Sequence, residues 1–145
     1  MRILGIDYGD KRIGLAVSDP LCITAQGIGH YQVSHKTKDA LYFKELVARY
    51  DIAEIVIGLP LKMDGSPGSR VEKTKKFAAW LEKELGLPVK FWDERLTTKQ
   101  ALHILQEHNA PPWKKKKVID QIAATIILSD YLESKRDNPY DSKNR

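Results

Sequence analysis

The stretch MRILGIDYGDKRIGLAVSD, residues 1–19, decides how the rest of the chain is interpreted. Two short β-prone runs, residues 3–6 and 13–17, flank turn-forming residues 8–11, a pattern typical of a β-hairpin. Asp7 ends the first run, directly after apolar residues that are expected to be buried. An unpaired buried carboxylate is costly, so Asp7 either starts the turn or binds a metal ion. Three nearby glycines favour the close approach of another backbone or of a phosphate: Gly5, Gly9 and Gly14.

The apolar periodicity of the remaining chain predicts alternating helices and strands. The expected strands cover parts of 22–33, 54–58 and 89–92, and the expected helices cover about 38–50, 69–85, 97–107 and 116–135. This order predicts an α/β fold with a mixed five-stranded sheet and helices on both faces. The first three strands would form an antiparallel meander, followed by alternating helices and strands. We expect one domain over residues 1–135 and a polar, flexible tail over 136–145.

Composition and charge limit the classes of partner and the compartment. Lys and Arg outnumber Asp and Glu by 24 to 19, and the resulting net charge of +5 favours a polyanionic partner. The single cysteine, Cys22, excludes an internal disulfide and a cysteine zinc site, which fits a reducing compartment. The N-terminus lacks a signal-peptide pattern, and no apolar run approaches the roughly 18 residues of a membrane span. We therefore expect a cytoplasmic protein that binds no membrane.

Acidic residues recur where predicted elements begin or end. Asp93 and Glu94 end the fifth strand, and Asp120 opens the last helix. The helix dipole favours an anion in a first turn, which alone could explain Asp120. Ala123 and Ala124, three and four residues further on, would also let this helix lie close to the sheet. A carboxylate on such a packed face needs a partner, and a cation shared with Asp7 would provide one.

Four ordered motifs are together similar to those of the YqgF/RuvX family. They are GIDYGDKRIGLAVSD (5–19), VIGLPLKMDGS (56–66), DERLTT (93–98) and VIDQIAA (118–124), and the resemblance spans about residues 2–132. It implies an RNase H-like fold and a nuclease that hydrolyses phosphodiester bonds. Members of the family are named as Holliday junction resolvases or as nucleases that process pre-16S rRNA.

The resemblance also implies a catalytic and metal-binding site made of Asp7, Glu94 and Asp120. Better-known RNase H-like nucleases commonly carry the second acid at the end of the fourth strand, but here that strand runs into Gly58-Leu59-Pro60. Glu94 would take this role, and Asp93 remains open as a further or alternative ligand. Carboxylates are the ligands that Mg²⁺ or Mn²⁺ prefers, and phosphodiester hydrolysis by this class commonly uses two such ions.

Basic residues near these acids are candidates for binding the substrate phosphates. Lys11 and Arg12 lie in the predicted turn beside Asp7. Arg95 could bind the scissile phosphate or simply neutralise Glu94. A run of four cations precedes Asp120 and could bind phosphate or be a solvated helix entrance: Lys114, Lys115, Lys116 and Lys117.

The favoured function is 5′-end processing of pre-16S rRNA in ribosome biogenesis, and the main alternative is resolution of four-way DNA junctions. A resolvase cuts two strands and normally needs a two-fold dimer, whereas the apolar stripes of this sequence are already needed to cover the sheet. We therefore expect a nucleic-acid-binding monomer, with a homodimer as the alternative. A non-catalytic nucleic-acid-binding module would fit the charge equally well. GIDYG also resembles the first phosphate-binding segment of actin-like ATPases, which need two such domains.

Overall fold

A computed structural model describes residues 1–60, 68–93 and 112–136, with only the helical backbone described for 112–121. Its sheet contains five strands: β1 (Arg2–Asp7), β2 (Arg12–Ser18), β3 (Ala25–Gln32), β4 (Ile52–Leu59) and β5 (Val89–Asp93). Their order is β3-β2-β1-β4-β5. The first three strands pair antiparallel, and β4 and β5 add parallel to β1. The predicted mixed sheet with an N-terminal meander is confirmed.

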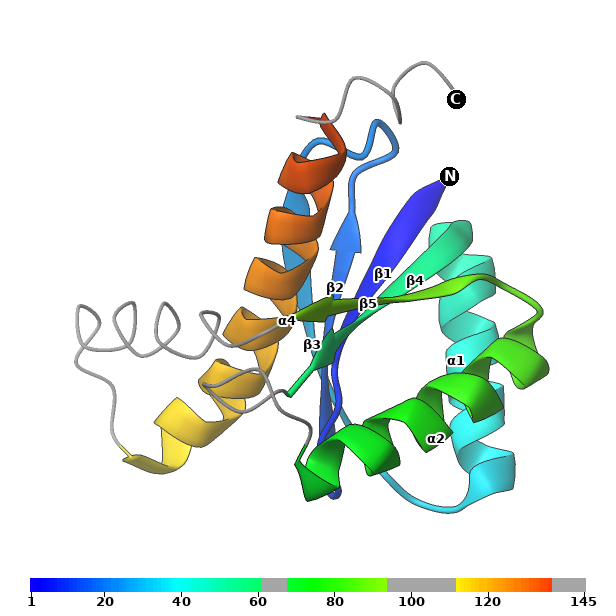
Figure 1. Cartoon of the computed structure of the whole chain (residues 1–145), viewed down its shortest axis with the longest axis vertical. Helices are drawn as coiled ribbons and strands as arrows, with labels where there is room; N and C mark the ends of the chain where they lie inside the picture. The colour runs from blue at the N-terminus through cyan, green and yellow to red at the C-terminus, as the bar shows by residue number, and fades with distance from the viewer. Residues whose placement is uncertain (61–67, 94–111, 137–145) are drawn as a thin grey trace.

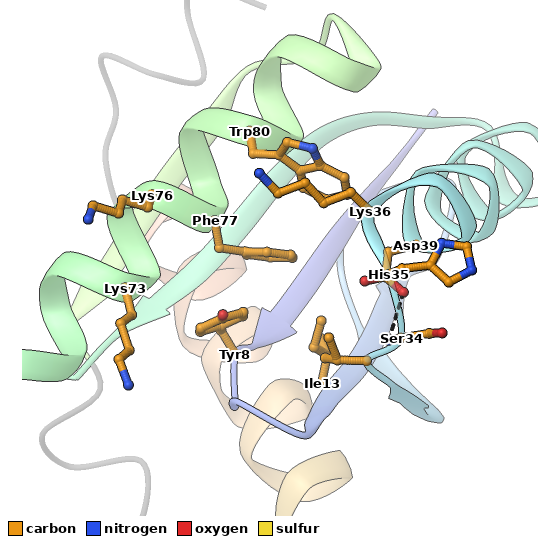
Figure 2. Close-up of a pocket in the computed structure, with 11 residues that line it drawn as sticks. Tyr8, Ile13, Ser34, His35, Lys36, Asp39, Lys73, Lys76, Phe77 and Trp80 are labelled. Carbon is orange, nitrogen blue, oxygen red and sulfur yellow. Dashed lines mark hydrogen bonds between the residues drawn. The ribbon is translucent and has the colours of Figure 1, made fainter.

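Helices cover both faces of this sheet, as predicted. Helices α1 (Lys36–Tyr50) and α2 (Ser69–Leu85) lie on one face, and α4 (Pro112–Arg136) lies on the other (Figure 1). A cavity of about 420 Å³ opens where α1 and α2 approach the turn between β1 and β2 (Figure 2). None of the described helices is long and apolar enough to cross a membrane.

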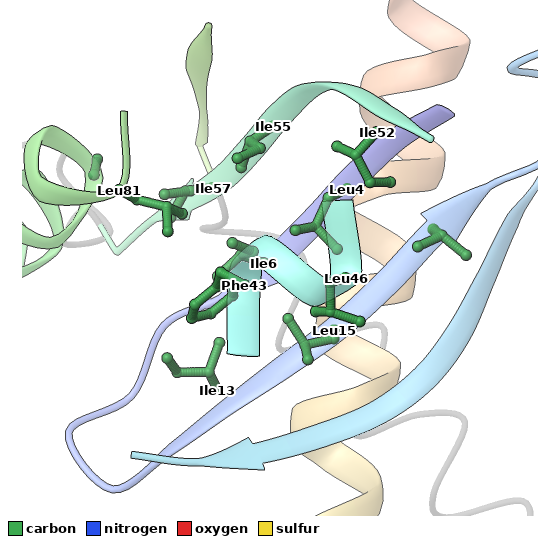
Figure 3. Close-up of a cluster of buried hydrophobic side chains, with 12 residues drawn as sticks. Leu4, Ile6, Ile13, Leu15, Phe43, Leu46, Ile52, Ile55, Ile57 and Leu81 are labelled. Carbon is green, nitrogen blue, oxygen red and sulfur yellow. The ribbon is translucent and has the colours of Figure 1, made fainter. Parts of the chain in front are cut away.

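The core is divided between the two faces because successive side chains of a strand point in opposite directions. Leu4 and Ile6 of β1 are fully buried among residues of β2, β4, α1 and α2 (Figure 3). Ile3 instead belongs to a second cluster, which it shares with α4. Residues 3, 5 and 7 of β1 are therefore the residues on the α4 face.

Helix α4 crosses β1 at a very short distance. A Cβ atom at Gly5 would lie 2.7 Å from Leu128 Cβ and 3.1 Å from the carbonyl oxygen of Ala124. Both Ala124 and Leu128 are buried. The close backbone approach expected near the glycines of the first hairpin is therefore found at Gly5, and the approaching element is α4.

The expectations about the last helix need correction, and the helix predicted before it lies outside the described residues. The helix begins at Pro112 rather than near Lys116, because proline has the right φ angle for a first helical residue and loses no hydrogen bond there. Asp120 is consequently about two turns inside the helix, so the argument from a first-turn dipole is wrong. The helix predicted for 97–107 lies outside the described residues.

The third strand is shorter than the 22–33 segment but irregular in the expected way. Leu15 pairs with Gly29 and Ala16 with Gly27, which leaves Ile28 as the extra residue of a bulge. Gly29 has φ +110°, a value that L-residues rarely adopt. Cys22 lies outside the strand, in the turn that precedes it.

Candidate active site

Asp7 lies at the carboxyl end of β1, the central strand of the sheet. It pairs with Gly14 of β2 and is half-buried. Ile3 belongs to the cluster beneath α4, and Gly5 is the residue that α4 crosses. Because side chains alternate along a strand, Asp7 belongs to the same face.

The carboxyl ends of β1, β4 and β5 lie at one edge of the sheet because these three strands are parallel. Asp93 ends β5 at this edge, opposite Leu59 of β4. In open α/β sheets ligands bind at such an edge, where the strand order changes direction. Here the change falls between β1 and β4, directly beside Asp7.

Asp93 nevertheless belongs to the other face of the sheet. Trp92 contacts Tyr131 of α4 with ring centroids 6.2 Å apart, so it is on the α4 face. Val89 packs in the cluster beneath α1 and α2. The alternation of the strand therefore puts Asp93, which is exposed, on the α1/α2 face. Asp7 and Asp93 share an edge of the sheet but not a face.

The position of Asp120 follows from how α4 runs along β1. Glu54 pairs with Ile3 and accepts hydrogen bonds from Tyr131 Oη at 3.1 Å and Lys135 Nζ at 2.8 Å. One step further along β1, Gly5 meets Ala124 and Leu128. Successive residues of β1 thus lie beside progressively earlier turns of α4.

The same relation between strand and helix positions can be extended from Gly5 to Asp7. Two strand residues advance about 6.6 Å, and the four helical residues from Ala124 back to Asp120 span about 6 Å. The backbone positions of Asp7 and Asp120 are therefore expected at the same level of the helix–sheet interface.

The other predicted site residues are described only in part. Glu94 and Arg95 lie outside the described residues, and the side chains of Asp120 and of Lys114–Lys117 are likewise not described. The lysine run occupies the first two turns of α4. No three histidine, cysteine or carboxylate side chains gather around a common point within the described part of the chain, a part that omits two of the predicted ligands.

Lys11 is exposed in the turn between β1 and β2, and Arg12 is the half-buried first residue of β2. The structure also brings two cations of α2 to this turn that the motifs did not indicate. Arg70 Nη2 donates a hydrogen bond of 3.2 Å to the carbonyl oxygen of Tyr8, and Lys73 Nζ lies 3.8 Å from a carboxylate oxygen of Asp10. Their spacing of three residues, which continues to Lys76, is the sequence signal that could have identified a basic face on α2.

Tyr8 connects this basic face to the end of β1. Its ring stacks on Phe77 of α2 with centroids 4.4 Å apart. Burial, and secondarily the negative charge of Asp10, raise the pKa of Tyr8, while Arg70 acts in the opposite direction. The phenol therefore remains protonated at neutral pH.

Comparison with known proteins shows the family to which this chain belongs. Residues 1–134 match the model of the family described as RuvX, Holliday junction resolvase. A protein of Halothermothrix orenii is 49% identical over 134 residues, which cover 91% of this chain and 94% of that protein. A protein of Koribacter versatilis is 44% identical over 144 residues, covering 97% and 94%. Both carry the name "Putative pre-16S rRNA nuclease".

Solved structures of resolvases share the fold at low sequence identity. RuvC of Thermus thermophilus, in complex with a Holliday junction substrate, has a TM-score of 0.52 at 15% identity and covers 94% of this chain and 96% of its own. The Fowlpox virus resolvase, in complex with Holliday junction DNA, has a TM-score of 0.55 at 17% identity and covers 92% and 98%. The predicted RNase H-like architecture is thus confirmed by fold and the predicted family by sequence, and the chain belongs to the RuvX family.

Proposed function

We propose that this chain is a metal-dependent nuclease that hydrolyses phosphodiester bonds of precursor 16S rRNA. The observation that supports the proposal is the crossing of α4 over Gly5, because the residue spacings of strand and helix lead us to expect the backbone of Asp120 at the level of Asp7. The names of the relatives at 44% and 49% identity support the choice of substrate. The net charge of +5 suits a polyanion of either kind.

The donor set fits a hard divalent cation. Asp7 is a half-buried carboxylate at the sheet edge, and further acids of the motifs follow β5 and lie on α4. Asp7, Glu94 and Asp120 would hold Mg²⁺ or Mn²⁺, with Asp93 as the less favoured ligand because it belongs to the opposite face. When bound, two such ions would activate the attacking water and stabilise the leaving oxygen.

The protein's own residues would orient the substrate. Acids brought together on one face would repel one another, and a bound cation would remove that repulsion. Lys11, Arg12, Arg95 and the lysine run would hold the phosphates beside the acids and fix the strand relative to Asp7. Oxygen ligands held on a central strand and a packed helix move little, which favours a constant geometry for the attacking water.

Resolution of DNA junctions is the second candidate. It is favoured by the description of the family and by the shared fold of two resolvases solved with junction DNA. Both functions would use the same acids, so the choice between them depends on the substrate and on the oligomeric state.

Asp7→Asn tests the proposed catalytic site. It keeps the shape of the side chain but removes the charge that would hold a cation. A lost metal contact worth several kcal/mol corresponds to a loss of cleavage on the order of a hundredfold or more. Cleavage of a precursor 16S rRNA fragment should require Mg²⁺ or Mn²⁺ and stop in excess chelator. The melting temperature without metal should stay equal or rise.

Asp51→Asn is the matched control, because Asp51 is exposed at the other end of β1 and adopts φ 52°, which asparagine tolerates. It should cleave as wild type does. Full activity of folded Asp7→Asn, or full activity in chelator, would contradict the proposed site.

A further inference from the structure

The cavity between α1, α2 and the β1–β2 turn lies on the opposite face of the sheet from α4 (Figures 1 and 2). We propose that it binds an unpaired base of a single-stranded RNA segment next to the cleaved bond, with lysines at its rim binding the adjoining phosphates. This proposal rests on the nuclease function proposed above. The cavity volume of about 420 Å³ is within the range of small-molecule sites.

Aromatic rings form one wall of the cavity. Phe77 stacks on Tyr8, and its centroid lies 5.9 Å from that of Trp80 (Figure 2). All three side chains are half-buried, so each keeps part of its surface accessible. Rings of this kind are where unpaired bases stack in proteins that bind single strands.

The charged groups at the cavity favour an anion. Lys36, Lys73 and Lys76 line it from two different helices, and all three are exposed. Asp39 is the acidic residue of the lining, and its carboxylate is already engaged within the protein. Its Oδ1 accepts hydrogen bonds from Tyr31 Oη at 2.6 Å and from the backbone N–H of Ser34 at 3.0 Å.

The cavity continues along the two helices, which favours a strand over a single nucleotide. A second hollow of about 350 Å³ lies between α1 and α2 and shares Lys36 and Trp80 with the first. Lys44 and Glu84 both line this second hollow and lie 3.8 Å apart, so Lys36 is the cation of this hollow that is not in an ion pair with a described residue. Two adjoining hollows with cations along them match the repeating base and phosphate of a polynucleotide.

The position of Tyr8 relates this cavity to the proposed active site. Tyr8 directly follows Asp7, the last residue of β1, and its stacking on Phe77 places its ring on the α1/α2 face. A strand that passes over the carboxyl edge of the sheet could therefore reach Asp7 on one side and the stack of Tyr8 and Phe77 on the other. Lys73 and Arg70 lie at that edge, beside the β1–β2 turn.

The direct test measures binding of fluorescently labelled hexauridylate by anisotropy over a range of salt concentrations, without divalent metal. Lys73→Gln/Lys76→Gln should weaken binding and reduce the slope of log affinity against log salt by about 1.4, or 0.7 per lost contact. Lys75→Gln/Lys83→Gln is the matched control, since it removes the same charge from exposed positions of the same helix that do not line the cavity. The control should keep the wild-type slope.

The contribution of the base is tested with an abasic strand of the same length, which needs no change to the protein. Loss of one stacked base should weaken binding roughly five- to a hundredfold. Hexauridylate should also quench part of the tryptophan fluorescence, and Trp80→Phe should abolish that part. Equal affinity for the abasic strand, equal slopes for the two lysine pairs, or competition by free uridine monophosphate as strong as by the hexamer would overturn the proposal.

Failure of this inference can be told apart from failure of the proposed function. If wild type cleaves precursor rRNA in a metal-dependent way but the two double lysine variants show the same salt dependence of binding, only the cavity assignment is wrong. If the binding results are as expected but no cleavage of any nucleic acid is found, the cavity binds a single strand and the nuclease assignment is wrong.

Discussion

At the scale of single residues, the structure bears on Asp93, which the sequence leaves open as a further or alternative ligand beside the favoured Glu94. Asp93 and Glu94 are neighbours, so composition and spacing do not distinguish them. The contact of Trp92 with Tyr131 puts position 92 on the α4 face and position 93 on the other. Since Asp7 is on the α4 face, Asp93 is poorly placed to share an ion with it.

Glu94→Gln should therefore damage cleavage more than Asp93→Asn. We expect Asp93→Asn to keep activity within a few-fold of wild type and Glu94→Gln to lose on the order of a hundredfold, if Glu94 contributes an ion contact of several kcal/mol. The measurement is the cleavage rate at saturating Mg²⁺ with both variants shown to be folded by circular dichroism. The opposite ranking would make Asp93 the ligand.

Asp19 stabilises the turn between β2 and β3 through its charge. Its carboxylate accepts hydrogen bonds from the backbone N–H groups of Thr24, Ile23 and Leu21, at 2.7, 2.7 and 3.1 Å. The bond from Thr24 is the largest cause of a pKa below the ordinary value of 3.8; burial, the next largest contribution, raises the pKa, and the other hydrogen bonds lower it. The folded state thus favours the ionised form.

The stability that Asp19 contributes is present above its ordinary pKa and is lost as the pH falls through the lowered folded value. Asp19→Asn should lower the melting temperature at pH 7 and make its decline below about pH 4 shallower. Melting curves from pH 7 to pH 2.5 test this, with Asp51→Asn as a control of equal charge change. If the melting temperature of Asp19→Asn declined below pH 4 as steeply as that of wild type, the ionisation of Asp19 would not be linked to folding.

At the scale of elements, the distance between α4 and β1 determines the proposed site. Gly5 has no Cβ, and this allows the backbone of α4 to approach at Ala124. The ion pair of Lys135 with Glu54, in which the side chains are 22% and 15% exposed, holds the C-terminal part of the same helix. The crossing therefore sets how near the N-terminal part of α4, which carries Asp120, comes to Asp7.

Gly5→Ala should destabilise the fold and reduce activity together. The added methyl would overlap Leu128 and push α4 away, at a cost of about 1–3 kcal/mol in the free energy of unfolding. Gly29→Ala is the control: its Cβ would meet nothing within 4 Å, and the cost is backbone strain alone. Urea unfolding and cleavage rate should separate the two, since Gly29→Ala loses stability but keeps activity. Unchanged activity in a destabilised Gly5→Ala would mean that the crossing does not position the site.

The order and type of the described elements were predictable, because each has a strong local signal. β4 contains the apolar run Ile55-Val56-Ile57, and α2 ends at Gly86, which has φ 65°. The start of α4 was not predicted, because Pro112 can equally break or begin a helix. The four lysines that follow also argued against a helix start, since cations are unfavourable near its N-terminus. Packing of the apolar residues from Ala124 to Leu132 against the sheet outweighs that local cost.

At the scale of the whole molecule, the position of a candidate site residue could be predicted only where that residue lies within a single motif. Asp7 and its place at the end of β1 follow from residues 1–19 alone. The contact of Arg70 with Tyr8 joins residues 62 positions apart and depends on how α2 docks on the sheet. Likewise, the opposite faces of Asp7 and Asp93 follow from the strand register, which spacing in the sequence does not contain.

The oligomeric state distinguishes the two candidate substrates, precursor rRNA and a DNA junction, because symmetric cleavage of a junction needs two active sites related by a two-fold axis. The large apolar side chains exposed on the described surface are few and dispersed. Leu41 is on α1 and Phe91 is on β5. Leu21 and Ile23 flank Cys22, whose Sγ lies 3.7 Å from the carbonyl oxygen of Met1, so these two side chains are near the N-terminus. A stable dimer buries about 800 Å² of polar and apolar surface on each partner, whereas these exposed apolar side chains are divided among separate elements.

We therefore expect a monomer that cuts a single RNA strand. Sedimentation velocity of the purified protein, alone and with a four-way DNA junction, measures the state directly. Gel analysis of junction and precursor rRNA after incubation with Mg²⁺ measures the choice of substrate. Cleavage of the RNA by a monomer that leaves the junction whole is the expected result, because one site with a basic approach is sufficient for a flexible strand. A stable dimer that nicks opposing junction strands at symmetric positions and leaves the RNA intact would instead make this chain a resolvase.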